Sequence, residues 1–382
     1  MDNITHESAK TRPVFKRRSR GLLLSYNCNL ACSYCYIDKK CDKIMPFEVA
    51  QKAVSGAFES SESFCFHEVE IDFAGAEPLT AFDRLKQVSE WIWSKNWPKP
   101  YVLFATTNGT LLNQEMREWF TRYKDRISLG LSFDGDADTQ NQNRSESFSA
   151  VDLDFFLNTW PNQPVKMTIS ENTVWNLAQD IISLHKKGFQ IMANPANGMK
   201  AWSRQSISEF ARQLSILIDF YLKNPDIKRV SFLSLDLKAI LSSSCRFGNK
   251  YCGAGLAYDV IDVDGRSYPC HMFSPLVQTE ERISGLKNID FTAREPFLCE
   301  MCSKCILNPI CPSCYGLNYK RTGDPARREL SLCRLFTLQV MANCKYNIRV
   351  LKEKNCVSNN EYETIKAIRK IYNFFYDNGE RR

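Results

Sequence analysis

The sequence predicts an α/β fold, in which a partial (β/α)6 barrel of the TIM type is followed by a small cysteine-rich domain and C-terminal helices. Two observations predict this fold. Strand-like apolar runs alternate with helix-like amphipathic runs six times in the first two hundred residues, and the short connections are typical of parallel βα units. The sixteen cysteines fall into two sets, five near the start and eleven between Cys245 and Cys356.

The six predicted strands cover residues 21–26, 69–73, 101–106, 127–133, 165–169 and 190–193. The predicted helices cover residues 46–59, 80–95, 113–123, 152–158, 174–187 and 207–222. In the first helix, Phe47, Ala50, Val54 and Phe58 share one face, as the helical period requires. Parallel strands end at one edge, so the loops that follow them meet at the face where barrels place their active sites.

The chain is predicted to divide into five segments. A basic extension covers residues 1–20, and its run of Lys16, Arg17, Arg18 and Arg20 is typical of a solvated tail. The further segments are the barrel at 21–225, a bridging segment at 226–244, the cysteine-rich domain at 245–345 and a helical tail at 346–382. Two helices are expected between residues 335 and 376, on either side of residues 356–360.

The composition excludes several classes of protein. The net charge of +7 comes from 50 basic and 43 acidic residues, and no helix-turn-helix or RNA-binding signature accompanies it, so no nucleic-acid partner is predicted. The net positive charge is compatible with an acidic peptide as a partner. No apolar run reaches the roughly 20 residues that span a bilayer, and no secretory signal opens the chain. We therefore expect a cytoplasmic protein without a membrane partner.

Cysteine indicates the chemistry. A reducing cytosol disfavours disulfides, and only four histidines are present, so a metal site would be rich in thiolates, which select zinc or iron–sulfur clusters. Cys28, Cys32 and Cys35 follow the first predicted strand. Three thiolates on one loop can bind three irons of a [4Fe–4S] cube and leave the fourth iron open. The alternatives are a zinc loop or buried thiols, but the spacing is not that of a zinc knuckle and no histidine lies nearby.

The segment CNLACSYCY at residues 28–36 resembles the signature of the radical S-adenosylmethionine (SAM) superfamily. That resemblance implies that the open iron chelates SAM, whose reductive cleavage gives a 5′-deoxyadenosyl radical that abstracts a hydrogen atom. Gly75-Ala76-Glu77-Pro78 is similar to the family's GGEP motif, which meets the SAM amine at Gly75 and Glu77. Ala76 is expected to replace glycine without strain if its φ is not positive.

Two further strand ends, Thr107-Asn108-Gly109 and Ser132-Phe133-Asp134-Gly135, resemble the next motifs of the family. The resemblance assigns Ser132 and Arg144 to the SAM carboxylate and Asn108 to the SAM pocket. Tyr34 and Tyr36 flank the last cysteine and are expected to border the adenine. Taken one at a time, the glycines of these motifs could be ordinary turn residues, and Arg144 could be an ordinary surface charge. The motifs nevertheless follow consecutive predicted strands in the order that the family shows, and this order favours the resemblance.

The later cysteines form a second pattern, which resembles the SPASM domain and its two auxiliary [4Fe–4S] clusters, giving three clusters in all. The resemblance implies that Cys245, Cys252, Cys270 and Cys314 would hold the first auxiliary cluster, and Cys302, Cys305, Cys311 and Cys333 the second. Zinc ribbons also use Cys-x2-Cys pairs and remain the alternative. Cys311 and Cys314 are one residue closer than is usual, and Cys299 adds a thiol, so ligands can exchange among Cys299, Cys302 and Cys314.

Four cysteines have no pattern and are interpreted as small buried hydrophobic residues. They are Cys41, Cys65, Cys344 and Cys356.

The resemblance implies a radical SAM/SPASM maturase that abstracts a hydrogen atom from a ribosomally made precursor peptide and forms a C–C, C–S or C–O crosslink. A sulfatase maturase that forms formylglycine, or another SPASM dehydrogenase, is the alternative enzyme. His271 stands where sulfatase maturases carry their aspartate, and Ala74 where they carry a glutamine. His271 is therefore the candidate base or, alternatively, a hydrogen-bond donor beside a cluster. A zinc-rich scaffold or a nucleic-acid-binding protein is the alternative outside enzymes.

The partners follow from the same resemblance. About 20 residues precede the first predicted strand, fewer than a leader-binding domain needs, so the peptide leader is expected to bind a separate protein or an exposed strand edge. The radical chemistry needs an electron donor of the flavodoxin or ferredoxin type.

Overall fold

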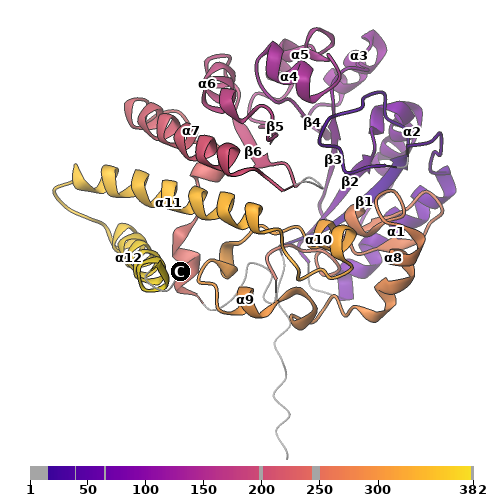
Figure 1. Cartoon of the computed structure of the whole chain (residues 1–382). Helices are drawn as coiled ribbons and strands as arrows, with labels where there is room; N and C mark the ends of the chain where they lie inside the picture. Colours follow the sequence, from indigo (N-terminus) through magenta and orange to yellow (C-terminus); the bar gives the residue numbers. More distant parts are fainter. Residues whose placement is uncertain (1–15, 39, 64–65, 198–200, 243–249, 380–382) are drawn as a thin grey trace, which may run out of the picture.

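Six parallel strands form the interior of the protein, and helices surround them (Figure 1). This computed structural model describes residues 16–38, 40–63, 66–197, 201–242 and 250–379. The strands are β1 (Arg17–Ser25), β2 (Glu68–Gly75), β3 (Tyr101–Thr107), β4 (Ile127–Leu131), β5 (Val165–Ile169) and β6 (Ile191–Pro195). The predicted α/β class is confirmed.

The strands follow one another around an open barrel. β1, β2, β3 and β4 pair side by side, and β5 pairs with β6. A single bridge between Ser132 and Lys166 joins the end of β4 to β5. All these pairings are parallel, so the strands end at the same edge.

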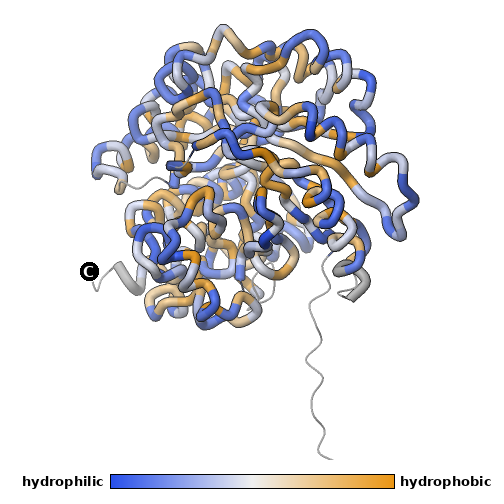
Figure 2. Tube along the Cα trace, turned by 90° about the vertical axis from the view of Figure 1, so that its right-hand side faces the viewer, coloured by the Kyte–Doolittle hydropathy of each residue, from blue (hydrophilic) through white to orange (hydrophobic). Residues whose placement is uncertain are grey.

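Alternation along the strands separates an apolar outer face from a polar inner one. In β2, Val69, Ile71 and Phe73 are buried in the main hydrophobic core, whereas the side chains between them lie on the other face. Figure 2 shows orange, apolar segments running through the interior and blue, polar ones along the outer loops. The inner face is therefore free to carry polar chemistry.

Helices on the outside cover this core (Figure 1). They are α1 (Phe47–Ser63), α2 (Phe82–Trp93), α3 (Gln114–Arg122), α4 (Ala137–Asn143), α5 (Leu153–Thr159), α6 (Leu177–Lys186) and α7 (Arg204–Lys223). All but α4 overlap predicted helices. α4 contains only polar residues and alanine, so it carries no apolar period that a sequence pattern could reveal.

A hairpin from the cysteine-rich region completes the sheet. β7 (Tyr258–Ile261) pairs in parallel with β1, and β8 (Ser267–Tyr268) pairs antiparallel with β7, so the sheet order is β4-β3-β2-β1-β7-β8. Strands of four and two residues carry too little periodicity for the sequence to predict them.

The prediction of a solvated basic tail is wrong for residues 17–20, which belong to β1. Arg18 and Arg20 are 8% and 9% exposed and both bind Asp259 of β7, with N–O distances of 2.6 and 2.7 Å. Arg18 also donates to the carbonyl of Leu256, and Arg20 to that of Ala53. One carboxylate and two carbonyls compensate most of the cost of burying these two guanidinium groups, although Arg18 Nε has no acceptor among the described residues.

The remainder of the cysteine-rich region has short helices, and two long helices end the described chain. The short ones include α8 (Glu280–Gly285), α9 (Glu300–Ser303) and α10 (Tyr315–Thr322). α11 (Leu330–Lys352) packs beside α7, and α12 (Asn359–Gly379) packs beside α11, as the sequence predicts (Figure 1). Among the described residues, every helix is too short or too polar to traverse a lipid bilayer.

Candidate active site

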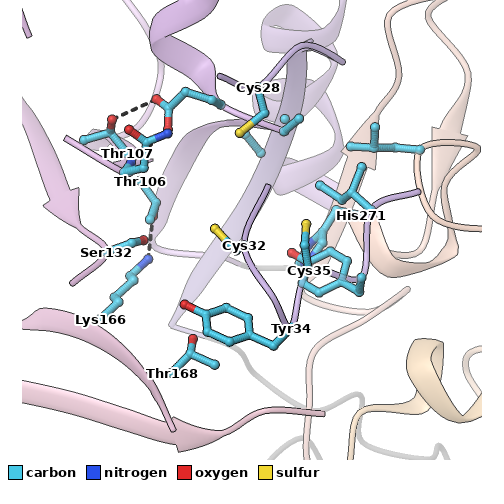
Figure 3. Close-up of a pocket in the computed structure, with 18 of the residues that line it drawn as sticks. Cys28, Cys32, Tyr34, Cys35, Thr106, Thr107, Ser132, Lys166, Thr168 and His271 are labelled. Carbon is cyan, nitrogen blue, oxygen red and sulfur yellow. Dashed lines mark hydrogen bonds between the residues drawn. The ribbon is translucent and has the colours of Figure 1, made fainter. Parts of the chain in front are cut away.

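The three cysteines of the first motif lie on the loop after β1. Neighbouring elements hold this loop: Asn29 donates to Thr110, the Ala31 amide donates to Ser145, and the Ser33 amide donates to the Asn143 carbonyl. Figure 3 shows the sulfur atoms of Cys28, Cys32 and Cys35 around one space. The loop thus presents three half-buried thiols from a fixed backbone.

All of the predicted cofactor-binding residues, together with His271, line one cavity of about 470 Å³. This active cavity lies at the carboxyl ends of the barrel strands. The predicted residues that line it are Cys28, Cys32, Cys35, Tyr34, Tyr36, Gly75, Glu77, Asn108, Ser132, Arg144 and His271. The parallel topology brings them together from the ends of β1, β2, β3 and β4, and His271 joins them from the turn after β8.

Gly75 is required where β2 leaves the sheet. Its φ is +142°, and a Cβ atom there would lie 2.4 Å from the Ser25 carbonyl oxygen. Among the described residues, only Ser145 and Glu146 have positive φ without being glycine, so the backbone of Ala76 is unstrained. The expectation that alanine fits this position is confirmed.

Glu77 joins the end of β2 to the end of β3. Its buried carboxylate accepts hydrogen bonds from the Leu79 amide (3.1 Å), the Thr107 hydroxyl (2.8 Å) and the Asn108 amide (2.8 Å). Burial raises the pKa of Glu77, although these hydrogen bonds oppose the rise. Glu77 therefore fixes the backbone around the cavity edge.

Asp134, to which the sequence assigned no role, is the main polar anchor of the site. Its buried carboxylate accepts from the Tyr34 hydroxyl (2.5 Å), Arg144 Nη2 (3.0 Å) and the Thr168 amide (2.9 Å). It also accepts from Asn143 Nδ2 at 3.2 Å. One carboxylate thus connects the cysteine loop, the segment after α4 and β5.

The charge of Asp134 keeps Arg144 cationic. Burial, the largest single effect, lowers the pKa of Arg144, but Asp134 together with Tyr34 and Cys32 outweighs burial and raises it. The guanidinium also lies over the ring of Tyr34, 5.5 Å from its centre. Arg144 Nε is buried and has no acceptor within the described residues, which leaves one donor for a ligand in the cavity.

His271 begins a short helical turn directly after Cys270 and lies beside Cys35 (Figure 3). Its ring centre lies 5.9 Å from that of Tyr36. Burial, with a smaller contribution from Lys166, lowers the pKa of His271 to about 4. The imidazole is therefore neutral at neutral pH.

The later cysteines form two groups. The first thiol group comprises Cys252, Cys270 and Cys314, and it packs in one hydrophobic core. Burial raises the pKa of Cys314 to about 11, and the neighbouring Cys252 contributes to the rise. Cys245, the expected fourth member, lies outside the described residues.

The second thiol group comprises Cys299, Cys302, Cys305, Cys311 and Cys333. Burial raises the pKa of Cys302 to about 12, Arg328 opposes the rise, and a hydrogen bond that the Cys302 thiol donates to Cys299 adds to it. Cys314 belongs to the first group and Cys299 to the second, so the structure separates two of the three thiols between which we expected exchange.

The thiols of each group do not converge on one point. Among the described residues, no three His, Cys, Asp or Glu side chains are placed to hold a single metal ion. In an iron–sulfur cluster each thiolate binds its own iron, so such ligands surround a larger volume than the ligands of one ion do.

The four unpatterned cysteines differ in burial. Cys344 is fully buried, as predicted. Cys41 and Cys356 are exposed, so the prediction of burial is wrong for both, because each lies in a polar loop segment outside the core. Cys65 lies outside the described residues.

Comparison with known proteins supports the family resemblance, although no family model matches the chain. The anaerobic sulfatase-maturating enzyme of Clostridium novyi is 24% identical over 280 residues, 65% of this chain and 72% of that enzyme. The subtilosin biosynthesis protein AlbA of Bacillus subtilis is 24% identical over 320 residues, 77% of this chain and 67% of AlbA. An uncharacterized protein of Methanocaldococcus jannaschii is 30% identical, but the match covers only 37% of its length.

Solved structures share the fold. anSMEcpe with bound AdoMet has a TM-score of 0.65 at 20% identity and covers 90% of this chain and 97% of its own. Streptococcus suis SuiB bound to its precursor peptide SuiA has a TM-score of 0.53 at 16% identity, over 84% of this chain and 76% of its own. In fold and in sequence, the chain is similar to radical SAM enzymes that modify peptides.

The floor of the active cavity carries an acidic and a basic side chain that the sequence did not reveal. Asp72 of β2 and Lys166 of β5 both line the cavity. Lys166 Nζ donates to Thr106 Oγ1 at 2.6 Å (Figure 3). It also lies 4.6 Å from the centre of the Phe104 ring. Asp72 has no hydrogen-bond partner among the described residues, and burial raises its pKa to about 6 despite Lys166.

Replacing Asp72 with asparagine is expected to stabilise the protein at pH 8 by about 1–3 kcal/mol. The unfolded chain releases this proton near pH 4, whereas the folded protein retains it to about pH 6. The ionised carboxylate therefore disfavours folding as pH rises through this interval, and the gain from asparagine is lost below it. Unfolding midpoints measured between pH 4 and 8 test this, with exposed Asp83→Asn as the control.

Proposed function

We propose that this protein is a radical SAM enzyme with a SPASM domain and that it forms a side-chain crosslink, C–C, C–S or C–O, in a ribosomally made precursor peptide. The convergence of all the predicted cofactor residues on one cavity supports this proposal most directly. The two curated relatives named for a maturation or biosynthesis step, and the peptide-bound SuiB structure, also support a peptide substrate.

We assign a [4Fe–4S] cluster to Cys28, Cys32 and Cys35, and SAM to the rest of the cavity. When bound, SAM would supply the 5′-deoxyadenosyl radical that takes a hydrogen atom from the peptide. Arg144 is held by Asp134 and keeps its Nε donor free for the SAM carboxylate, next to Ser132. The oxygens of Glu77 are already hydrogen bonded, so we assign the SAM amine to the backbone of residues 75–77, which Glu77 positions.

Tyr34 forms part of the wall of the proposed SAM site. Its hydroxyl binds Asp134 and its ring lies under Arg144, so it forms a wall of the cavity close to the cysteines. Tyr36 and Asn108 line the same cavity and remain assigned to the SAM pocket. Asn108 is fixed through its hydrogen bond to Asn29 of the cysteine loop, at 3.0 Å.

We assign two auxiliary [4Fe–4S] clusters to the two thiol groups, with Cys245 completing the first. A separate leader-binding protein and an electron donor of the flavodoxin or ferredoxin type remain part of the proposal. His271 is the candidate proton acceptor on the substrate side, because it is neutral and borders the cavity.

A sulfatase maturase is the second candidate function, and the high coverage of anSMEcpe favours it. His271 and Ala74 favour the crosslinking function, because the resemblance places an aspartate and a glutamine at these positions in sulfatase maturases. The two functions predict different products.

Coexpression with small open reading frames beside the gene, followed by mass spectrometry of the peptide, tests the proposal. We expect the peptide to lose two hydrogen atoms and to keep a covalent link between two side chains after proteolysis. The anaerobically purified enzyme should be brown and hold about twelve irons per chain. A formylglycine product would favour the sulfatase maturase, and a colourless protein that holds zinc would refute both enzyme functions.

A further inference from the structure

Arg328 is a half-buried cation among the sulfur atoms of the second thiol group. It lies in the connection between α10 and α11, and its Nη1 donates to Cys311 Sγ at 2.6 Å. It is also close enough to Cys302 and Cys333 to oppose the rise that burial causes in the pKa of each thiol. One guanidinium therefore faces three of the five thiols.

Arg328 has no carboxylate partner within the described residues. The neighbouring Glu329 forms its ion pair with Arg321 instead. Arg328 Nε is buried without an acceptor. A buried guanidinium normally has an acidic partner, because leaving the charge unpaired is costly. Thiolates are the remaining source of negative charge in these surroundings.

This region borders the active cavity. A second cavity, of about 290 Å³, is lined by Arg328, Cys311 and Cys333, and it shares Asn194 and Asn197 with the active cavity. The end of β6 and the residues directly after it therefore line both cavities.

We propose that Arg328 is the counter-ion of the iron–sulfur cluster that the second thiol group holds, and that it raises the reduction potential of that cluster. The inference rests on the proposed function, which assigns a cluster to these thiols. Adding an electron makes a thiolate-ligated cluster more negative, and a nearby cation favours the more negative form. Hydrogen bonds to the sulfur ligands act in the same direction, and net charge and hydrogen bonding are known to set such potentials.

Redox titration followed by electron paramagnetic resonance tests this inference without any peptide. The starting protein carries Cys28, Cys32 and Cys35 replaced by alanine, so that only auxiliary clusters give signals. Into it are introduced Arg328→Gln, Arg328→Lys and, as the matched control, Arg327→Gln, since Arg327 is an exposed neighbour. We expect Arg328→Gln to shift one auxiliary signal to lower potential and to leave the other unchanged. Arg328→Lys should shift it less, and Arg327→Gln should not shift it.

Two results would overturn the inference: an unchanged potential in Arg328→Gln at full iron content, or loss of the same iron from both Arg328 variants, which would indicate a packing role. Loss of iron from Arg328→Gln but not from Arg328→Lys would support the counter-ion. If the starting protein itself binds no auxiliary iron, the proposed function fails rather than the assignment of Arg328.

Discussion

Replacing Cys28, Cys32 and Cys35 together with alanine is expected to abolish SAM cleavage and to remove about four irons per chain, while the auxiliary iron stays bound. The three thiols lie on one loop and line one cavity, whereas the other two thiol groups lie in a different part of the chain. The loop backbone is held by Thr110, Ser145 and Asn143 rather than by its sulfur atoms, so the fold should survive.

The measurement is the formation of 5′-deoxyadenosine with dithionite as reductant, alongside iron analysis. Cys41→Ala is the matched control, because Cys41 lies close by in the sequence and is exposed. It should keep both the iron and the SAM cleavage of the unmodified protein. Cleavage that persists in the triple variant would contradict the assignment of the catalytic cluster.

Replacing Asp134 with asparagine is expected to destabilise the protein by about 3–5 kcal/mol and to impair SAM cleavage. The change leaves the buried guanidinium of Arg144 without its carboxylate, and it weakens the hydrogen bonds from Tyr34 and the Thr168 amide. Because Tyr34 lies between two cysteines of the motif, the loss of this anchor also loosens the cysteine loop.

Denaturant unfolding under anaerobic conditions measures this loss. Asp138→Asn, an exposed change on the same α4 segment, should leave stability within about 0.5 kcal/mol of the unmodified protein. Combining Asp134→Asn with Arg144→Gln should recover part of the stability, since it removes the unpaired charge. A double variant less stable than Asp134→Asn alone would argue against an ion pair as the main source of the effect.

The sequence predicts the barrel well because its strands and helices carry strong apolar periods. Each of the six predicted strands overlaps an observed one, and the motifs at their ends meet because parallel strands end at one edge. β7 escapes prediction because its pairing with β1 depends on contacts across more than two hundred residues, and β8 because it has only two residues. The burial of Arg18 and Arg20 depends on the same distant partner, Asp259.

The polar residues of the site are harder to predict than its cysteines. In the sequence, Asp72 resembles any polar residue of a strand with alternating burial. Only the curvature of the barrel places the inner face of β2, and with it Asp72, at the floor of a cavity. Asp134 stands inside a motif that the sequence singled out, but nothing local reveals that four donors converge on it. In the strand EVEIDFAG, three acidic residues at alternate positions were the available signal of a polar inner face.

The pairing of β1 with β7 means that the thiol-rich region is a structural part of the barrel. A chain that ended before β7 would expose the backbone groups of β1 along one edge and would leave Arg18 and Arg20 without their shared carboxylate. The strand that leads into the cysteine loop therefore reaches its full set of backbone and ion-pair partners only when residues near 260 are present.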